Sequence, residues 1–311
     1  MRDFLAFGEP LVGFYPEGGS SLAEDVSVVK TWGGDTSNFA IGVSRLGHPC
    51  TYLTRVGDDP FGRGFRALWE ANGVDVSRVE TDPNRGTGLY FVSFDGGRHS
   101  LTYYRKDSAA SAFVPEGLSG IPLKNFRIVH LTGISLGMSE SARAAGLELI
   151  RRTKTAGCRV SFDVNYRAAQ WPSRDAAAAA LAGAIGEGVD FLELTDDEAE
   201  SLGWGTRLGD IRARFPAVPT VVLKQGKAGV SVAAGGLEFS LPAFEVPVVD
   251  TVGAGDSFDS GFLCATLEGA PPLEAARFAA ASAALTCTGR GPLERMPRRA
   301  EVDAFLRDHA G

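Results

Sequence analysis

The 311-residue sequence has few of the residues that hold disulfide-rich or zinc-binding proteins together. Its four cysteines are far apart and form no C-x-x-C pair; they are Cys50, Cys158, Cys264 and Cys287. This spacing indicates neither a disulfide framework nor a zinc site. We interpret the four residues as reduced and mostly buried, which is usual for free cysteine.

Excess positive charge and long apolar runs are also missing. The 38 acidic residues outnumber the 31 lysines and arginines, so the formal net charge is -7. A nucleic acid or an anionic membrane surface would require a basic face, so neither is an expected partner. No segment is apolar enough to span a bilayer, and the apolar run within residues 1–8 is too short for a signal peptide. We expect a cytoplasmic protein that binds a small molecule.

Two common nucleotide-binding motifs are absent as well. The sequence contains no G-x-x-x-x-G-K-[ST] segment. The segment 253–258, GAGDSF, fails the G-x-G-x-x-G dinucleotide pattern because Phe258 stands in place of the third glycine. The protein is therefore neither a Walker-type ATPase nor an ordinary NAD enzyme.

The sequence does have enough apolar residues, 44%, to bury a substantial core. Short apolar strands alternate with longer helical patterns: residues 128–131 precede 141–150, and residues 160–162 precede 175–185. Further apolar runs follow in the same manner. Apolar strands joined by helices predict an α/β fold with a mostly parallel sheet covered on both faces.

Two other β-rich stretches need not belong to that sheet. Residues 88–105 are typical of a hairpin around Asp95-Gly96-Gly97, where glycine accepts a positive φ. The second stretch covers residues 4–15 and 26–32. Together they predict a small sheet that projects from the main body, as a lid does.

The strongest chemical signal is the segment 248–258, VVDTVGAGDSF, in which a strand end and two small-residue kinks lead into a helix. A helix start presents free N–H groups and a positive dipole end, so Gly253, Ala254 and Gly255 can stabilise a transferred phosphoryl group. Asp256 can accept the proton of an attacking hydroxyl, and we expect the helix dipole to keep it ionised. The alternative is a plain N-terminal helix acid beside a tight turn.

A competing motif, G-x-S-x-G, occurs at 133–137, after a strand and before a helix, as in the nucleophile elbow of a hydrolase. Ser135 would be the nucleophile. That fold needs a histidine after the serine in the chain, and of the four histidines only His309 follows it. We interpret His130 as a core-strand histidine, and a serine hydrolase stays a remote alternative.

The segment 250–258, DTVGAGDSF, closely resembles the C-terminal signature of the ribokinase-like (PfkB) carbohydrate kinase family. The family's other signature is similar to the segment 32–40, WGGDTSNFA, together with RLG at 45–47 and RVGDDPFG at 55–62. The resemblance therefore spans nearly the whole chain.

The resemblance implies a ribokinase-like α/β fold with residues 1–311 as one kinase domain. A small β-sheet lid, formed by segments about 10–32 and 86–108, would close over the sugar. It implies ATP and Mg2+ as cofactors and leaves a requirement for a monovalent cation such as K+ open. It also implies a homo-oligomer, either a dimer through the lid sheets or a higher assembly.

The resemblance also implies which residues bind the nucleotide and the metal. The segment 224–229, KQGKAG, looks like the family's nucleotide-contacting strand and turn. At 195–198, TDDE stands where many members carry N-x-x-E, so threonine replaces the asparagine, and Glu198 would help to organise magnesium through water. The implied nucleotide-binding residues are Asn165, Lys224, Gly226, Gly229, Gly253 and Gly255.

Three segments resemble 2-keto-3-deoxygluconate kinases more than ribokinases or fructokinases: GGDT at 33–36 with Asn38, YYR at 103–105, and FDVNYR at 162–167 with Trp171. The implied reaction phosphorylates the terminal hydroxyl of the sugar acid to give its 6-phosphate. The implied substrate-binding residues are Gly34, Asn38, Tyr90, Tyr103, Arg105, Arg167 and Asp256.

A sugar acid carries a carboxylate, which the planar fork of arginine can bind bidentately, and we expect Arg105 and Arg167 to do so. If residues 103–105 form a strand, Tyr103 and Arg105 face the substrate and Tyr104 faces away. Three alternatives stay open: arginines that are only solvated surface charges, a kinase of a neutral sugar or nucleoside, and a sugar-sensing module without catalysis.

Overall fold

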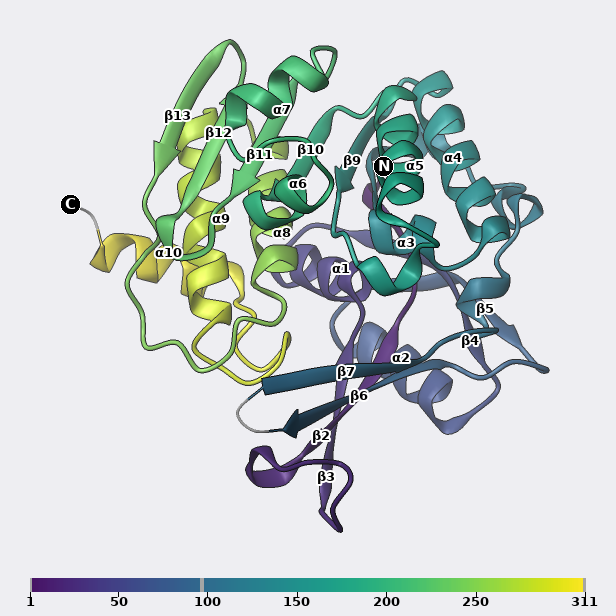
Figure 1. The fold of residues 1–311 in the computed structure, drawn as a ribbon. Coiled ribbons are helices and arrows are strands. Elements are labelled where there is room, and N and C mark those ends of the chain that lie inside the picture. The colour runs from purple at the N-terminus through teal and green to yellow at the C-terminus, as the bar shows by residue number, and fades with distance from the viewer. Residues whose placement is uncertain (1, 96–97, 310–311) are drawn as a thin grey trace.

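The computed structural model describes residues 2–95 and 98–309. Its main body is a nine-stranded sheet, which Figure 1 shows between layers of helices. The strand order is β13-β12-β11-β10-β9-β8-β1-β4-β5. Neighbouring strands from β11 to β5 run parallel, whereas β12 is antiparallel to both β11 and β13. The predicted mostly parallel sheet is confirmed.

The bounds of these elements follow the predicted alternation. The strands of the large sheet are β1 (Arg2–Phe7), β4 (Cys50–Gly57), β5 (Asp75–Asp82), β8 (Phe126–Thr132), β9 (Arg159–Asp163), β10 (Phe191–Thr195), β11 (Thr220–Lys224), β12 (Val230–Ala234) and β13 (Leu237–Leu241). The α-helices are α1 (Asp35–Arg45), α2 (Pro60–Ala71), α3 (Gly133–Gly137), α4 (Glu140–Thr155), α5 (Arg174–Gly186), α6 (Asp196–Ser201), α7 (Leu208–Arg214), α8 (Ala254–Leu267), α9 (Pro272–Thr286) and α10 (Arg299–Asp308). Short 3-10 turns lie at Glu17–Gly19, Ala110–Ala112, Pro115–Leu118, Leu123–Asn125, Ala168–Gln170 and Gly226–Ala228.

The predicted helices over 141–150 and 175–185 form as α4 and α5, and each begins after a serine. The side chain of Ser139 accepts a hydrogen bond from the N–H of Ala142, and that of Ser173 accepts one from Ala176. These caps satisfy donors that the first helical turn leaves unpaired. None of the helices in the described ranges has the length and apolar character to cross a membrane.

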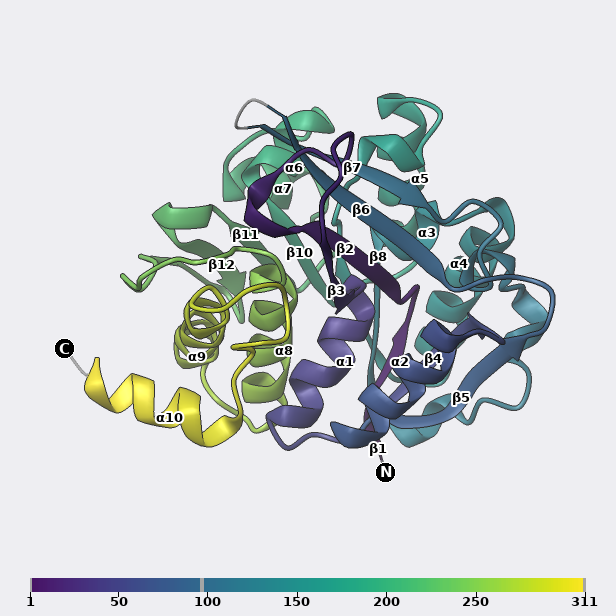
Figure 2. The ribbon, with the colours of Figure 1, turned by 90° about the horizontal axis from the view of Figure 1, so that it is seen from below.

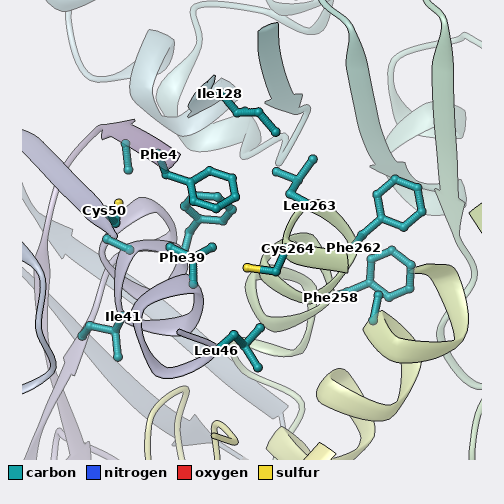
Figure 3. Close-up of a cluster of buried hydrophobic side chains, with 14 of the residues drawn as sticks. Phe4, Phe39, Ile41, Leu46, Cys50, Ile128, Phe258, Phe262, Leu263 and Cys264 are labelled. Atoms are coloured by element: carbon teal, nitrogen blue, oxygen red, sulfur yellow. The ribbon is translucent and has the colours of Figure 1, made fainter. Parts of the chain in front are cut away.

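Helices cover both faces of the large sheet because its strands are apolar on both faces. In β1, Phe4 belongs to one buried cluster and Leu5 to another. Alternate side chains of a strand point to opposite faces, so the two clusters lie on the two sides of the sheet. The first cluster packs against α1, α2, α8 and α9, and Figure 3 shows Phe39 of α1 and Leu263 of α8 within it. The second packs against α3 to α7.

A separate four-stranded sheet projects from this body (Figures 1 and 2). Its order is β3-β2-β6-β7, with β2 at Leu11–Pro16, β3 at Val28–Gly33, β6 at Gly88–Asp95 and β7 at Arg98–Tyr104. Parallel pairing of β2 with β6 joins two antiparallel hairpins that are distant in sequence. The turn residues Gly96 and Gly97 of the predicted hairpin lie outside the described residues.

The prediction that residues 4–7 belong to the small sheet is wrong. They form most of β1, which pairs with β4 and β8 in the large sheet. Phe4 to Phe7 are all buried, and a strand with apolar side chains on both faces needs cover on both sides. The large sheet, with helices on each face, provides that cover.

Leu263 on α8 is fully buried in the cluster that α8 shares with α1. Its truncation leaves a cavity there, so we expect Leu263→Ala to lower the free energy of unfolding by about 2–5 kcal/mol. Leu273 on α9 is 47% exposed, so the matched Leu273→Ala should change it by less than about 0.5 kcal/mol. Urea unfolding measures both, and equal losses would contradict this description of the core.

Candidate active site

A cleft of about 1120 Å³ lies at the carboxyl ends of the parallel strands, the edge where open α/β sheets bind ligands. The last residues of four neighbouring strands meet at this edge: Thr132, Asp163, Thr195 and Lys224. The small sheet contributes Tyr15, Tyr90, Leu101 and Tyr103 to the lining, the start of α1 contributes Gly34, Asp35 and Asn38, and residues 253–256 contribute the start of α8. The cleft therefore joins segments from most of the chain.

The start of α8 is a tight turn at Gly253. This residue has a φ of 82°, and a Cβ atom there would lie 2.5 Å from the Cβ of Pro292. Both the backbone conformation and the contact require glycine. The N–H groups of Gly255 and Asp256 belong to the first helical turn, where donors lack intrahelical acceptors, and these residues line the cleft. The arrangement can bind an anion, as the sequence predicts.

Asp256 faces α1 from this turn, and its Oδ2 accepts a hydrogen bond of 2.7 Å from Nδ2 of Asn38. Burial raises the pKa of Asp256 well above its usual value, the nearby Asp35 carboxyl raises it further, and the Asn38 hydrogen bond opposes them. Burial therefore acts against the helix dipole, which was expected to favour the ionised form, and the pKa of Asp256 is raised rather than lowered. A raised pKa makes the deprotonated group a stronger base.

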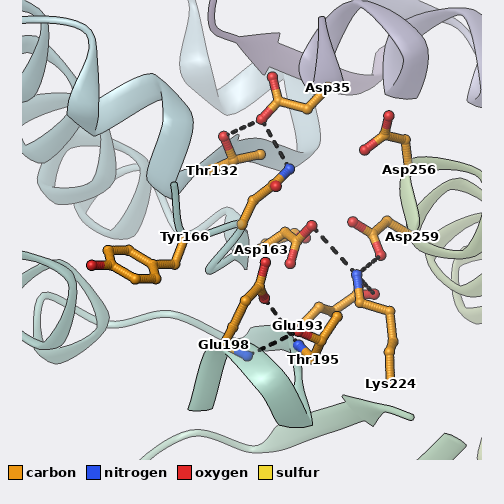
Figure 4. Close-up of polar contacts among 12 residues, drawn as sticks. Asp35, Thr132, Asp163, Tyr166, Glu193, Thr195, Glu198, Lys224, Asp256 and Asp259 are labelled. Carbon is orange, nitrogen blue, oxygen red and sulfur yellow. Dashed lines mark hydrogen bonds and ion pairs between the residues drawn. The ribbon is translucent and has the colours of Figure 1, made fainter. Parts of the chain in front are cut away.

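Asp35 lies close to Asp256 at the start of α1 (Figure 4). Its Oδ2 accepts hydrogen bonds from Oγ1 of Thr132 at 2.5 Å and from Nδ2 of Asn165 at 3.3 Å. Burial raises the pKa of Asp35, while the hydrogen bond from Thr132 opposes this by favouring the ionised form. Asn165 has a φ of 36°, an uncommon conformation for a residue other than glycine, and such strain is concentrated at functional sites. Asn165 thus joins the polar group around Asp35.

The floor of the cleft holds a buried ion cluster around Lys224 (Figure 4). Its Nζ lies 2.9 Å from Oδ1 of Asp259, 3.3 Å from Oδ2 of Asp163 and 3.9 Å from Oε2 of Glu193. Burial alone would lower the pKa of Lys224, but the three carboxyl groups raise it well above its usual value. Nζ is also 3.6 Å from the position of a Cβ on Gly255, so this cation faces the first turn of α8.

The predicted sugar-side residues meet at the other end of the cleft. Tyr90 and Tyr103 line it from the small sheet, and the hydroxyl oxygens of Tyr90 and Tyr15 are 3.1 Å apart. Tyr104 is 64% exposed and points to the opposite face, as strand alternation predicts. Gly34 has a φ of 98°, and its Cβ would lie 2.4 Å from the backbone oxygen of Glu9. Glycine at this position is thus explained by packing against the protein's own backbone.

The two predicted arginines have different surroundings. Arg105 follows β7 and forms an ion pair with Glu9, whose side chain is fully buried. Among the described residues, Arg105 is not part of the cleft lining, whereas Arg167 is. The Nη1 atom of Arg167 lies 3.3 Å from Oε1 of Glu198, and its side chain is 44% exposed. The structure therefore brings one of these two arginines to the cleft and pairs the other with Glu9.

The predicted nucleotide side is formed by loops beyond β10 and β11. Gly226 and Gly229 line the cleft there, as does Glu198. Glu198 and Thr195 form a capping box for α6, in which Oε2 of Glu198 accepts from the N–H of Thr195 and Oγ1 of Thr195 accepts from the N–H of Glu198. Threonine thus has a structural role at this position.

The serine hydrolase alternative does not agree with the structure. Ser135 is fully buried, and its hydroxyl donates to the backbone oxygen of Phe7 at 2.8 Å. His130 bonds Ser161 through Nδ1 at 3.0 Å, and burial lowers the pKa of His130 to about 3. The G-x-S-x-G segment is the short helix α3, whose N-cap is Thr132. Ser135 therefore completes the capping box of a helix in the core.

Sequence reasoning missed four acidic residues of the site: Asp35, Asp163, Glu193 and Asp259. The position of Asp163 could have identified it, because it ends an apolar strand at the edge of the sheet where ligands bind. The position of Asp259 could have done so as well, since it follows Asp256 by three residues and lies on the same helix face. Glu193 had no such signal, because an acidic residue within a buried strand becomes meaningful only beside its partner Lys224.

Comparisons with known proteins agree over nearly the full length. The family model described as pfkB family carbohydrate kinase matches residues 2–299. A 2-dehydro-3-deoxygluconokinase of Thermoproteus tenax is 34% identical over 99% of this chain and 95% of the relative. Fructokinase-1 of Zea mays is 33% identical over 96% of this chain and 95% of the relative.

Solved structures show the same architecture. The fructokinase of Vibrio cholerae O395, bound to fructose, ADP and calcium, has a TM-score of 0.86 and 26% identity, with coverage of 98% of this chain and 99% of the other. The Salmonella enterica aminoimidazole riboside kinase, with its riboside and an ATP analogue, has a TM-score of 0.85 and 28% identity, with coverage of 98% and 100%. The chain belongs to the PfkB family of carbohydrate kinases and has the ribokinase-like fold.

Proposed function

We propose that this sugar kinase transfers the γ-phosphoryl group of ATP to the terminal hydroxyl of a sugar acid of the 2-keto-3-deoxygluconate type. The observation that carries the reaction is the buried carboxyl group of Asp256 on the first turn of α8. It lies between an anion-binding helix start and the side of the cleft that the small sheet and α1 form. A base and an anion site thus share one short turn.

In this mechanism the substrate hydroxyl oxygen attacks the γ-phosphorus, and the bond between the γ-phosphorus and the oxygen that leaves with ADP breaks. The hydroxyl proton passes to Asp256. The N–H groups of the 253–256 turn stabilise negative charge on the transferred group, and Lys224 adds a positive charge near Gly255. Asn38 orients the base through its hydrogen bond.

The residues present fit a magnesium ion held largely by ligand phosphates and water. Within the described ranges, no group of three or more His, Cys, Asp or Glu side chains could hold a metal. Mg2+ typically uses only one or two carboxylates together with phosphates and water, and Asp163 and Glu198 line the cleft. When bound, the ion neutralises charge on the phosphates. An Escherichia coli structure with a TM-score of 0.90 and 26% identity holds ATP and Mg2+.

The small sheet suits the role of a lid over the sugar. Its face towards the cleft carries Tyr15, Tyr90 and Tyr103, together with Leu101, which is 45% exposed. Closure would bury this apolar surface and exclude water from the transferred phosphoryl group. A homo-oligomer, either a dimer through the lid sheets or a higher assembly, stays a prediction.

Arg167 supports an acidic substrate, because it lines the cleft and its ion pair with Glu198 is partly exposed. The Thermoproteus tenax relative, a 2-dehydro-3-deoxygluconokinase, points to the same substrate class. A neutral ketose is the second candidate. Glu9 already neutralises Arg105, and fructokinase-1 of Zea mays is nearly as similar in sequence.

Asp256→Asn should keep the fold and nucleotide binding but lower kcat by about two to four orders of magnitude, the usual effect of losing a general base. Asparagine preserves the shape of the side chain and cannot take the proton. Coupled measurement of ADP release gives kcat, and calorimetric titration with ADP provides the control. Turnover close to that of the unchanged protein would refute the assignment.

The raised pKa of Asp256 predicts an acid limb in the pH profile of kcat/KM. Only the carboxylate accepts a proton, so activity should rise as pH increases through this pKa and be lost below it. Asp35→Asn removes a charge that raises the pKa, so the limb should move to lower pH. An acid limb that stays at the same pH, or moves to higher pH, would contradict the coupling between the two groups.

A substrate panel separates the two candidates. We expect ADP release with 2-keto-3-deoxygluconate or its galactose-derived epimer to exceed that with gluconate, fructose, ribose or adenosine. Arg167→Ala should raise KM for the keto-deoxy acid about 10- to 100-fold, the effect of losing a charge-assisted hydrogen bond. Arg174→Ala, which removes an exposed arginine paired with Asp175, is the control. Preference for fructose with an unchanged KM in Arg167→Ala would establish the neutral substrate.

A further inference from the structure

A second cavity, separate from the cleft, is lined by side chains that are mostly charged. Its volume is about 230 Å³, and its lining consists of Arg45, Glu294, Arg295, Met296, Arg298 and Glu301. These residues come from the end of α1, the segment between α9 and α10, and the first turns of α10. Figure 2 shows the yellow segment before α10 passing beside α1. Three arginines thus converge on one small hollow.

Arg45 is the most constrained of them. It is partly buried, its Nε donates to Oδ1 of Asn72, and its Nη1 donates to the backbone oxygens of Leu293 and Met296, all at 2.8 Å. These bonds leave the Nη2 donors of the guanidinium available. Burial lowers the pKa of Arg45, and the like charge of Arg298 lowers it further, although Glu301 partly opposes this. A partly buried arginine held against another arginine lacks a close counter-charge.

The carboxyl groups of the cavity do not provide that counter-charge. Among the described residues, no carboxylate oxygen lies within 4.0 Å of a guanidinium nitrogen of these three arginines. Oε2 of Glu294 accepts from the N–H of Arg290 at 2.5 Å, and Oε2 of Glu301 accepts from the N–H of Arg298 at 2.7 Å. Both glutamates are therefore held by the backbone. Three cationic and two anionic groups leave the lining with a net positive charge.

One chain segment contributes residues to both the cavity and the cleft. The segment before α10 contributes Pro292 to the cleft lining, and two to six residues later it contributes Glu294 to Arg298 to the cavity. The two backbone oxygens that Arg45 binds belong to the same segment. An anion that bridges the arginines would therefore be bound beside the chain that packs against Gly253.

We propose that this cavity is a second anion site, which binds inorganic phosphate or the phosphate group of a small phosphomonoester through Arg45, Arg295 and Arg298. Arginine suits this ligand because its planar fork donates two parallel hydrogen bonds to phosphate oxygens. The volume admits a phosphate with a short substituent and is below the range of pockets for larger ligands. A bound phosphate also relieves the repulsion between Arg45 and Arg298.

The test is calorimetric titration of the full-length protein with inorganic phosphate at constant ionic strength. Arg295 and Arg298 are exposed, so the double variant Arg295→Ala/Arg298→Ala should keep the fold, which circular dichroism verifies. The substitutions lie outside the cleft, so phosphate binding in the cleft should be equal in every variant. A difference in phosphate binding between variants therefore reports on this cavity. Arg307→Ala on α10, an exposed arginine outside the cavity, is the matched control.

We expect the double variant to lose one phosphate site or to weaken it by at least about tenfold, the effect of one lost charge-assisted hydrogen bond. Arg307→Ala should bind as the unchanged protein does. Repeating the titration with a phosphomonoester distinguishes the two sources of the phosphate group. Identical binding by all three proteins, or no phosphate site beyond the one in the cleft, would overturn the proposal. If the double variant proves misfolded, the single variant Arg298→Gln decides in its place.

Discussion

Charge balance at the floor of the cleft is the constraint on which the rest of the site depends. Lys224 at the end of β11 contacts carboxyl groups from three other elements: Asp163 ends β9, Glu193 lies in β10 and Asp259 lies on α8. Buried carboxylates without a counter-charge are costly, and removing one partner of a buried ion pair typically costs about 3–5 kcal/mol. One lysine therefore connects three neighbouring strands to the helix that carries the proposed base.

The position of Asp256 follows from that connection and from the core beneath it. The helix α8 begins at the cleft, and its buried side chains pack in the same cluster as those of α1. The hydrogen bond between Asn38 and Asp256, which are 218 residues apart, then joins the first turns of two helices. Because protein interiors are densely packed, Asp256 is held by the core as well as by its polar neighbours. Burial on this turn is also what raises its pKa.

Local patterns predicted much of the fold and the reacting turn. Strands and helices each have a characteristic spacing of apolar residues that can be recognised in the sequence. The glycine-rich turn before Asp256 has a local conformation that few other sequences adopt. The errors came from contacts that no local pattern contains. Residues 4–7 were assigned to the small sheet because an apolar strand pattern does not indicate which sheet the strand joins. For Asp256, the effect of the helix dipole on its pKa was considered without the opposing effect of burial.

The sequence by itself determined the α/β class and the family and supplied the proposed base and the proposed anion-binding turn, because each depends on residues that are close together in the chain. The tertiary structure alone decided the charge state and partners of the polar groups. Arg105 pairs with Glu9, Lys224 with Glu193, and Arg45 with the segment before α10. The physical reason is that electrostatic energies depend on burial and on distances between groups, and both arise only when distant segments pack together.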